Sequence, residues 1–198
     1  MFEPDTDDPF ALFHSWFADA EASETTDPNA MTVATADAIG RPSARILLLK
    51  EADPRGFVFY TNFESRKGDE LAVNPFAALC FHWKSLKRQV RVEGPIVKVS
   101  DGEADAYFAS RARMSQTGAW ASQQSRPLAS RKALMTAVGK YETEYAGRDV
   151  PRPPYWTGAR VIPLRIEFWQ DGEFRLHDRF IYTRGSEGLP WTVTRLNP

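Results

Sequence analysis

From residue 31 onward, apolar residues recur in short segments separated by turn residues, and this pattern constrains the fold more than any other feature of the chain. Such segments are typical of strands, because alternate side chains of a strand face the same side. About eight strands, most of them joined by short turns, favour an antiparallel sheet closed into a barrel. The expected strands are 31–37, 43–50, 57–61, 76–83, 88–93, 96–99, 161–170, 173–183 and 191–196.

Helical periodicity is confined to a few segments outside the expected strands. Asp8 and Pro9 mark a helix start, since Asp is a good N-cap and Pro is tolerated in the first turn. Ser100 and Glu103 form the spacing of a capping box. The expected helices are 9–22, 65–74, 101–110 and 130–145. The fold class is therefore expected to be mainly β with peripheral helices, in a single domain over residues 1–198.

Composition excludes several protein classes. A content of 42% hydrophobic and 26% charged residues is typical of a globular chain. The longest apolar run, 76–81, is far shorter than the roughly 18 residues of a membrane span, and the N-terminus lacks the pattern of a signal peptide. The single cysteine, Cys80, excludes internal disulfides and cysteine metal clusters, so no metal site is expected. These features predict a reducing compartment, the cytoplasm. No strand–glycine-rich loop–helix unit indicates a dinucleotide-binding fold.

The charge is distributed unevenly along the chain. Residues 1–30 hold eight acidic side chains and no Lys or Arg, so the remainder of a chain with net charge −1 carries +7. A positive body favours anionic ligands, although a merely solvated surface would give the same balance. No dense Lys/Arg run or recognition motif predicts a nucleic-acid partner. The acidic segment 1–8 is expected to be disordered.

The first candidate site is the start of a predicted helix at Ser65, Arg66 and Lys67. Two cations in a first turn oppose the partial positive charge of a helix N-terminus. A bound phosphate would remove this mismatch, because free N–H groups and cations together form an anion site. Local compensation by Asp69 and Glu70, one turn later, is the alternative.

The second candidate site is formed by Tyr107, Arg111 and Ser115, which are spaced by four residues. On a continuous helix they would line one face. A phenol, a guanidinium and a hydroxyl that converge form a suitable receptor for a second phosphate. The alternative is a solvated surface arginine, since this spacing is common.

The third candidate site lies in the predicted strand 173–183, where Arg175, His177 and Arg179 would share one face. Three cationic or titratable groups on one face favour an acidic or electron-rich ligand, although a structural role for His177 is the alternative. Trp169, just before this strand, is placed to wall a planar cofactor.

A series of short motifs follows in a fixed order along the chain. The motifs are Arg45-Ile46-Leu47-Leu48-Leu49-Lys50, Phe59-Tyr60-Thr61-Asn62, Ser65-Arg66-Lys67, Arg88-Gln89-Val90, Ser110-Arg111 through Ser115-Gln116, Gly118-Ala119-Trp120, Gln124-Ser125, Glu167-Phe168-Trp169 and Arg175-Leu176-His177-Asp178-Arg179. Together, over residues 9–198, they resemble the pyridoxamine 5′-phosphate oxidase family.

The resemblance implies a split β-barrel homodimer with FMN at the subunit interface. It implies oxidation of pyridoxamine 5′-phosphate or pyridoxine 5′-phosphate to pyridoxal 5′-phosphate, with O₂ reduced to hydrogen peroxide, as in vitamin B6 metabolism. A related flavin oxidase of the phenazine-biosynthesis type is one alternative. A non-catalytic protein that binds FMN or pyridoxal phosphate is another.

The resemblance also implies roles for individual residues. The residues that match the family's FMN contacts are Arg45, Ile46, Leu47, Leu48, Leu49, Lys50, Tyr60, Thr61, Arg66, Lys67, Gln89, Gln124, Ser125, Trp169 and Arg179. The residues that match its substrate contacts are Lys50, Tyr107, Arg111, Ser115, Arg175, Leu176 and His177. Arg175 and His177 are the expected catalytic residues, and the C-terminal strands within 161–198 are expected to complete the site.

Two features depart from the simplest version of this resemblance. Arg45 and Lys50 have opposite parity, so a straight strand would place them on opposite faces unless a bulge or a strand end intervenes. The family's basic N-terminal segment, which closes over the substrate, has no match in the acidic residues 1–30. We therefore expect a more open active site, or one covered by another element.

Overall fold

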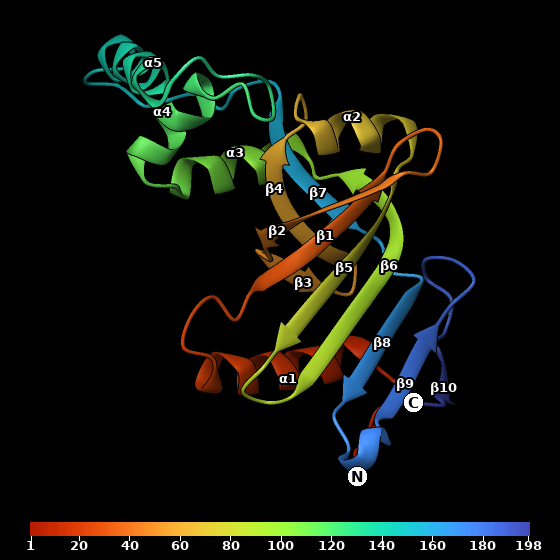
Figure 1. Cartoon of the computed structure of the whole chain (residues 1–198). Helices are drawn as coiled ribbons and strands as arrows, with labels where there is room; N and C mark the ends of the chain where they lie inside the picture. The colour runs from red at the N-terminus through yellow and green to blue at the C-terminus, as the bar shows by residue number, and fades with distance from the viewer.

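The computed structural model describes all 198 residues, which form one ten-stranded sheet and five α-helices (Figure 1). The strands are β1 (Ala30–Ala36), β2 (Pro42–Leu48), β3 (Glu51–Asp53), β4 (Gly56–Asn62), β5 (Phe76–Trp83), β6 (Arg88–Lys98), β7 (Trp156–Val161), β8 (Arg165–Gln170), β9 (Asp178–Thr183) and β10 (Thr192–Leu196). The helices are α1 (Pro9–Ser23), α2 (Arg66–Val73), α3 (Asp101–Ser110), α4 (Arg113–Ala121) and α5 (Arg131–Glu144), with a 3₁₀ turn η1 (Glu173–Arg175). The expected fold class, mainly β with peripheral helices, is confirmed.

Strand β6 divides the curled sheet into two parts. Its residues 88–93 pair with β5 and β8, whereas its residues 96–98 pair with β7. The change occurs at Gly94, where a Cβ atom would lie 1.9 Å from the carbonyl oxygen of Ile162, so no larger residue fits this close approach. Beyond β7 the sheet continues through β4 to β3, and just after the end of β2 the Lys50 N–H donates to the Val58 carbonyl of β4 at 2.9 Å. The result is a split β-barrel with an extension of three C-terminal strands.

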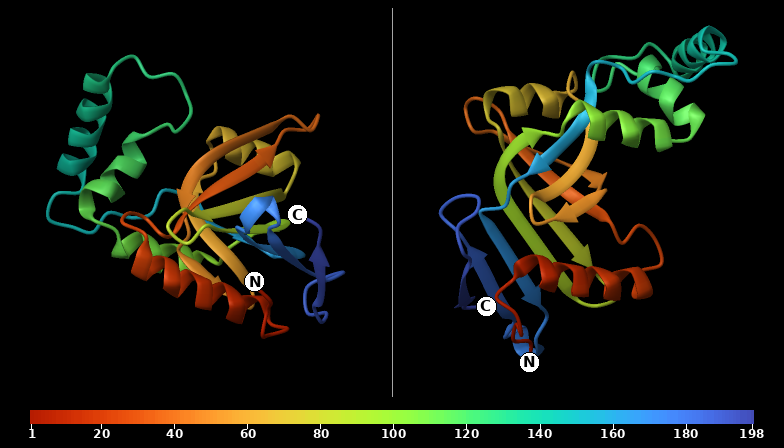
Figure 2. Two further views of the ribbon diagram at one scale, coloured as in Figure 1. Left: turned by 60° about the horizontal axis from the view of Figure 1, so that its bottom comes forward. Right: turned by 180° about the vertical axis from the view of Figure 1, so that it is seen from behind.

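Helix α1 covers one end of the barrel (Figure 2). The side chain of Asp8 accepts a hydrogen bond from the Phe10 N–H at 2.9 Å, as the N-cap prediction requires. Phe13 is 0% exposed, and its ring meets the ring of Phe57 edge-on with centroids 4.9 Å apart. This aromatic packing anchors the helix to β4 and builds the main core.

The acidic segment 1–8 lies against β9. Phe2 packs edge-on against Phe180 of β9, with ring centroids 5.5 Å apart. The Tyr182 hydroxyl donates to the Thr6 carbonyl at 2.7 Å. An aromatic residue among the acids therefore holds this segment against the sheet, which the charge count does not reveal.

Several elements differ from the expected boundaries. The expected strand 161–170 is interrupted at Pro163, which lacks the N–H that a ladder needs, and the chain forms β7 before it and β8 after it. The two strands expected over 88–93 and 96–99 form the single strand β6, which ends at Lys98, because pairing with β5 continues through Gly94 to Pro95 and pairing with β7 follows at once. Helix α4 was not expected; its N-cap residue is Ala112, which provides no side-chain cap.

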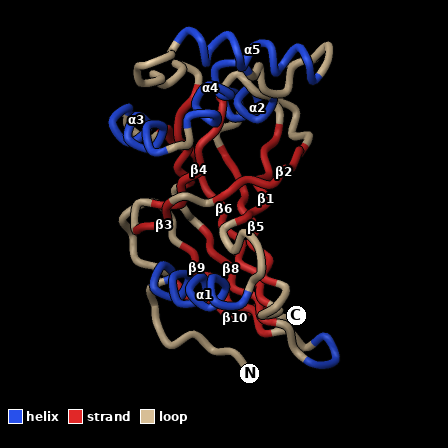
Figure 3. The backbone as a smooth tube through the Cα atoms, turned by 90° about the vertical axis from the view of Figure 1, so that its left-hand side faces the viewer, coloured by secondary structure: helices blue, strands red, loops and turns tan.

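The two ends of the molecule carry different elements. Helices α2, α3, α4 and α5 gather at one end, whereas β8, β9, β10 and α1 lie at the other (Figure 3). None of the helices combines the length and the apolar character that crossing a membrane requires. The expected site residues are divided between these two ends.

Candidate active site

A cavity of about 660 Å³ opens between β2, β4, α3 and α4. Ten of the expected site residues line it, from segments far apart in the sequence. They are Ile46, Leu47, Leu48, Lys50, Tyr60, Thr61, Tyr107, Arg111, Ser115 and Gln124. The structure therefore joins the first part of the expected FMN contacts with the expected phosphate receptor.

Three aromatic rings lie nearly parallel in the wall of this cavity. Tyr60 stacks on Tyr107 with centroids 4.0 Å apart, and on Trp156 with centroids 5.3 Å apart. Stacked rings of this kind bury a large apolar area and have a preferred geometry. The stack therefore fixes α3, which carries Tyr107, against β4 and β7.

Arg111 lies at the Trp156 side of this stack, with its guanidinium carbon 4.7 Å from the indole centroid. Its Nη1 atom is buried and has no hydrogen-bond partner, and burial lowers the pKa of the guanidinium. A buried guanidinium nitrogen without a partner is costly, so this geometry suits an oxyanion such as a phosphate. The ammonium group of Lys50, 5.9 Å from the Tyr107 centroid, brings a second cation to the cavity.

Tyr107, Arg111 and Ser115 all line the cavity, but not from the continuous helix that would place them on one face. Helix α3 ends at Ser110, and Arg111 has an extended backbone with φ −75° and ψ 149°. Helix α4 then begins at Arg113. A break between two short helices, rather than one continuous helical face, brings the three side chains together.

The start of α2 holds a buried cation. Ser65 occupies the N-cap position but does not cap the helix; its hydroxyl donates to the Asn62 carbonyl at 2.6 Å and accepts from Lys67 Nζ at 2.9 Å. Lys67 is 5% exposed, and its Nζ also donates to Gln124 at 2.8 Å. Burial, with repulsion from Arg45, lowers the pKa of Lys67 to about 8. A buried cation without a carboxylate partner, beside free N–H groups, forms an anion site.

Glu70 holds the two arginines near this helix start. Its carboxylate accepts from Arg66 Nε at 2.9 Å and from the Ser43 hydroxyl at 2.6 Å, and lies 3.4 Å from Arg45 Nη2. Burial works to raise the pKa of Glu70, but these hydrogen bonds and the arginine charge lower it to about 2. Local compensation therefore applies to Arg66, whereas Lys67 has no such partner.

The end of β2 explains how Lys50 reaches the cavity although its position has the opposite parity to that of Arg45. Strand β2 ends at Leu48, so Lys50 is not bound by its alternation and reaches the cavity without a bulge. Arg45 does not line the cavity; it donates to the Val33 carbonyl at 3.1 Å.

Two further expected FMN contacts, Leu49 and Ser125, do not line the cavity either. Leu49 is 7% exposed and belongs to the core. The exposed Ser125 follows Gln124 with a left-handed φ of 67°.

A second group of expected residues lies at the opposite end of the molecule. Gln89, Trp169 and Arg179 are Cα partners in one row across β6, β8 and β9. The carboxylate of Glu167, which is 8% exposed, accepts from Arg179 Nε at 3.0 Å and pairs with Arg91 at 3.4 Å. A buried carboxylate two residues before Trp169 on β8 therefore holds Arg179, one member of the row.

Arg175, Leu176 and His177 lie in the connection between β8 and β9, so the expectation that Arg175 and His177 share a strand face is wrong. Arg175 has a φ of 65°, in the left-handed region that is costly for a residue with a side chain. Leu176 is 70% exposed. The ring of His177 lies 4.7 Å from that of Trp169. A strained, exposed loop thus adjoins the row of the second group.

Sequence comparison assigns the chain to a family. The family model described as "Pyridoxamine 5'-phosphate oxidase" matches residues 17–144, and the model described as "Pyridoxine 5'-phosphate oxidase C-terminal dimerisation region" matches residues 156–198. The chain belongs to the pyridoxamine 5′-phosphate oxidase family. The second match contains Trp169, Arg175, His177 and Arg179, so most of the second group lies on the dimerisation region of this family.

Individual relatives of this family match nearly the whole chain. The pyridoxine/pyridoxamine 5′-phosphate oxidase of Azorhizobium caulinodans is 60% identical over 192 residues, which cover 97% of this chain and 91% of that protein. The protein of the same name from Maricaulis maris is 60% identical over 194 residues, which cover 98% and 87%. The chain is therefore an oxidoreductase.

Two solved structures are similar over the whole length. PhzG from Burkholderia lata 383, in complex with tetrahydrophenazine-1-carboxylic acid, has a TM-score of 0.92 at 32% identity and covers 100% of this chain and 98% of its own. A pyridoxamine 5′-phosphate oxidase-related, FMN-binding protein from Nostoc punctiforme has a TM-score of 0.77 at 17% identity, with 96% and 98% covered. The second likeness shows the split-barrel fold alone.

Some residues that shape or support the site carry little signal in the sequence. Trp156 lines the cavity beneath Arg111, but one tryptophan among six carries no signal that separates it from the core. Gly158 offers an indirect signal, since a Cβ atom there would lie 2.9 Å from the ring of Tyr60. A glycine inside a strand often marks such a close approach. The pairing of Glu70 with Arg66 follows from their local spacing, but its contact with Arg45 and the pairing of Glu167 with Arg91 carry no sequence signal, because those arginines lie on other elements.

Proposed function

We propose that this protein is an FMN-dependent oxidase that converts pyridoxamine 5′-phosphate or pyridoxine 5′-phosphate to pyridoxal 5′-phosphate, with O₂ reduced to hydrogen peroxide. The observation that carries the proposal is the cavity in which unpaired cations flank a stack of aromatic rings. Lys50 and Arg111 suit a phosphate, and the flat apolar wall suits a ring, so the cavity fits an aromatic phosphate ester.

The residues at the start of α2 fit the phosphate of FMN. Lys67 is a buried cation without a carboxylate partner, and the Thr61 hydroxyl is buried without a hydrogen-bond partner. Both groups are costly unless a ligand satisfies them. Arg66 and Gln124 would add donors from the same region. FMN, when bound, would supply the two-electron chemistry and pass the electrons to O₂.

The substrate phosphate is assigned to Lys50, Tyr107, Arg111 and Ser115. Arg111 keeps its charge throughout the neutral range, and its free Nη1 can donate to a phosphate oxygen. The Tyr107 and Ser115 hydroxyls would add neutral donors on the same cavity wall. These four side chains would anchor one end of the substrate, so that the opposite end is oriented for reaction.

Arg175 and His177 would act on the reacting end of the substrate. Arg175 cannot serve as a base near neutral pH, so its role is to donate hydrogen bonds and stabilise developing charge. His177 Nδ1 lies 3.2 Å from the Gly172 nitrogen and 3.1 Å from Asp171 Oδ1, so its own loop engages Nδ1 and leaves Nε2 for a ligand. We assign His177 a binding or proton-transfer role subordinate to that of Arg175.

A homodimer would bring the two groups together. The cavity and the Trp169–Arg179 row lie at opposite ends of one chain (Figures 1 and 3). The family's dimerisation region covers residues 156–198, which supports contact between two subunits through these strands. In a symmetric dimer, the cavity of one subunit would be completed by Arg175 and His177 of the other.

The likeness to PhzG favours a second candidate, an oxidase of a phenazine-type ring. The test is to purify the protein, saturate it with FMN and measure peroxide release. We expect release with pyridoxamine 5′-phosphate, little with pyridoxamine that lacks the phosphate, and little with tetrahydrophenazine-1-carboxylic acid. Preference for the phenazine compound would replace the proposal by the second candidate, and no peroxide with any of them would indicate a binding protein.

A further inference from the structure

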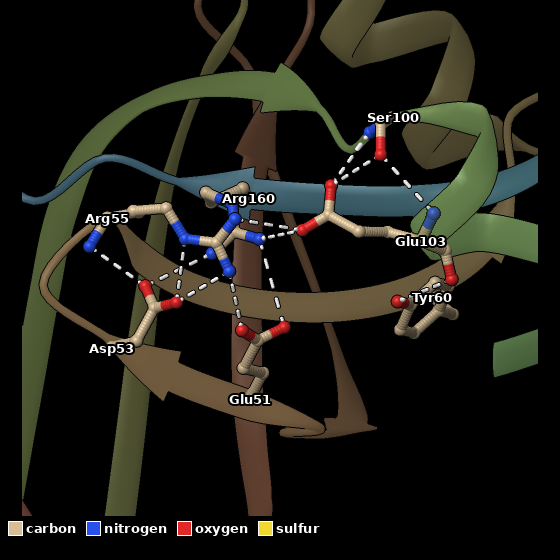
Figure 4. Close-up of polar contacts among 7 residues, drawn as sticks. All are labelled: Glu51, Asp53, Arg55, Tyr60, Ser100, Glu103 and Arg160. Carbon is tan, nitrogen blue, oxygen red and sulfur yellow. Dashed lines mark hydrogen bonds and ion pairs between the residues drawn. The ribbon is translucent and has the colours of Figure 1, made fainter. Parts of the chain in front are cut away.

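A buried arginine, to which no ligand contact is assigned, forms the centre of a cluster of polar contacts next to Tyr60 (Figure 4). Arg160, on β7, has a side chain that is 6% exposed. Its Nη2 donates to Glu103 Oε1 at 2.8 Å, and its Nη1 donates to Asp53 Oδ1 at 3.2 Å. Glu51 lies 3.8 Å from the same guanidinium. Arg160 is therefore the buried centre of a charge cluster that joins β3, β7 and α3.

Glu103 connects this cluster to the start of α3. Its second carboxylate oxygen accepts from the Ser100 N–H at 3.0 Å, and its own N–H donates to the Ser100 hydroxyl at 3.3 Å. These bonds form the capping box that the sequence predicts. One carboxylate thus holds both the first turn of α3 and the guanidinium of Arg160.

The first turn of α3 also contacts the cavity wall. The Tyr60 hydroxyl donates to the backbone carbonyl of Glu103 at 3.4 Å. Tyr107 follows Glu103 by one helical turn, and its ring lies 4.0 Å from the ring of Tyr60. A shift at the start of α3 would therefore move both rings.

We propose that Arg160 is a positioning residue that, through Glu103, sets α3 and hence Tyr107 at the phosphate end of the cavity. This inference rests on the proposed function, because it names the phosphate of the substrate as the group affected. Without Arg160, the interior would hold no positive charge between the carboxylates of Glu51, Asp53 and Glu103, and these like charges would repel one another.

Arg55 offers a matched control within the same cluster. It lies 2.8 Å from Glu51, 2.7 Å from Asp53 and 3.1 Å from Glu103, but its side chain is 57% exposed. An exposed arginine of this kind contributes little, because water screens its charges and competes for its hydrogen bonds. Arg55 and Arg160 thus contact the same three carboxylates, one from solvent and one from the interior.

The experiment compares Arg160→Met with Arg55→Met in the FMN-saturated dimer. Isothermal titration calorimetry with pyridoxal 5′-phosphate measures binding without turnover, and steady-state kinetics with pyridoxamine 5′-phosphate separates KM from kcat. For Arg160→Met we expect binding weaker by roughly 10-fold or more and KM raised to match, with kcat changed by less than about threefold. For Arg55→Met we expect changes below about twofold.

Two further variants distinguish positioning from a general loss of stability. Arg160→Lys keeps one charge and should restore part of the affinity. Glu103→Gln should weaken binding, and its effect should not add to that of Arg160→Met, because both break one linkage. If Arg160→Met fails to fold, Arg160→Lys and Glu103→Gln carry the test, and parental affinity in both would overturn the proposal.

The failure of this inference is distinct from that of the proposed function. If the parent binds pyridoxal 5′-phosphate and Arg160→Met binds it equally well, the positioning role is wrong, even where the melting temperature falls. If the parent itself does not bind pyridoxal 5′-phosphate, the proposed function is wrong and this inference falls with it.

Discussion

The guanidinium of Arg111 lies over the indole ring of Trp156, 4.7 Å from its centroid, while its buried Nη1 has no partner in the protein. The indole ring thus holds the guanidinium in place without occupying the N–H donors of Arg111. A carboxylate in the same place would hold Arg111 equally well but would occupy the donors that an anionic ligand needs. The stack is therefore a way to orient a cation and keep it free for a phosphate.

Replacing Trp156 by Leu is expected to weaken substrate binding. A partly buried cation–π contact contributes about 1–2 kcal/mol, which corresponds to roughly a 5- to 30-fold rise in KM for pyridoxamine 5′-phosphate. Trp156→Phe keeps an aromatic face and should lose less. Trp191→Leu is the matched control, since Trp191 lies 4.5 Å beneath Arg184 on the C-terminal strands. Equal effects of Trp156→Leu and Trp191→Leu on KM would show that the Arg111 stack is only structural.

If Lys67 binds the phosphate of FMN as proposed, FMN affinity should depend on pH. Its pKa, lowered to about 8 by burial and by Arg45, means that the free protein loses this charge as the pH rises past that value. A bound phosphate favours the charged form, so we expect FMN affinity to fall between about pH 8 and pH 10. Flavin fluorescence titrations measure this dependence.

Lys67→Met tests the assignment of that pH dependence. Losing one charge-assisted contact costs roughly 1.5–3 kcal/mol, so FMN should bind about 10- to 150-fold more weakly near pH 7, and the fall above pH 8 should disappear. Lys132→Met changes an exposed lysine and serves as the control. A fall of affinity that persists in Lys67→Met would assign the titration to another group.

The sequence predicts this part of the site better than the rest, and the reason is physical. A mismatch such as two cations at a helix start is local, so it can be recognised in Ser65–Lys67 without knowing the fold. The link from Arg45 to Glu70 joins residues of different elements, and no spacing in the chain reveals it. Sequence alone therefore cannot say which of the cations Glu70 compensates.

The geometry of two groups cannot be obtained from periodicity, for one reason. A shared face for Tyr107, Arg111 and Ser115 requires a helix that continues past residue 110, and a shared face for Arg175 and His177 requires a strand that begins at residue 173. The chain departs from regular structure at Arg111, which is extended, and at Arg175, which is left-handed. Tertiary contacts at functional loops decide such breaks, whereas periodicity describes only the regular elements.

Glu70 should make stability depend on acidity. Its pKa is lowered to about 2 in the folded protein, below the ordinary value of 4.5 for a glutamate, so its charged form stabilises the fold. That contribution is fully present above about pH 4.5 and is lost as the pH falls toward 2. We expect Glu70→Gln to lower the free energy of unfolding in urea at pH 6, with a difference from the parent that shrinks as the pH is lowered. Glu64→Gln, which changes an exposed carboxylate, should show no such convergence.

Because the expected site residues lie at two opposite ends of the folded molecule, the role of Arg175 can be tested by complementation. Arg175→Leu should keep FMN but lower kcat/KM by at least roughly 100-fold, about 2.7 kcal/mol of transition-state stabilisation. Arg111→Leu should raise KM through loss of the substrate phosphate contact. His177→Ala should cost less than Arg175→Leu, because no step requires a base at that position.

Mixed dimers of Arg111→Leu and Arg175→Leu distinguish a shared site from two separate ones. In a shared site, Arg111 comes from one subunit and Arg175 from the other, so each mixed dimer contains one site with both changes and one site with neither. Random mixing makes about half of the dimers mixed, and the preparation should recover about a quarter of parental kcat/KM, although each variant alone is nearly inactive. Differently tagged subunits allow the mixed dimer to be isolated, and it should then reach about half of the parental value. Mixed dimers that are no more active than the two variants would place Arg111 and Arg175 in the same subunit's site, and the interface arrangement would be wrong.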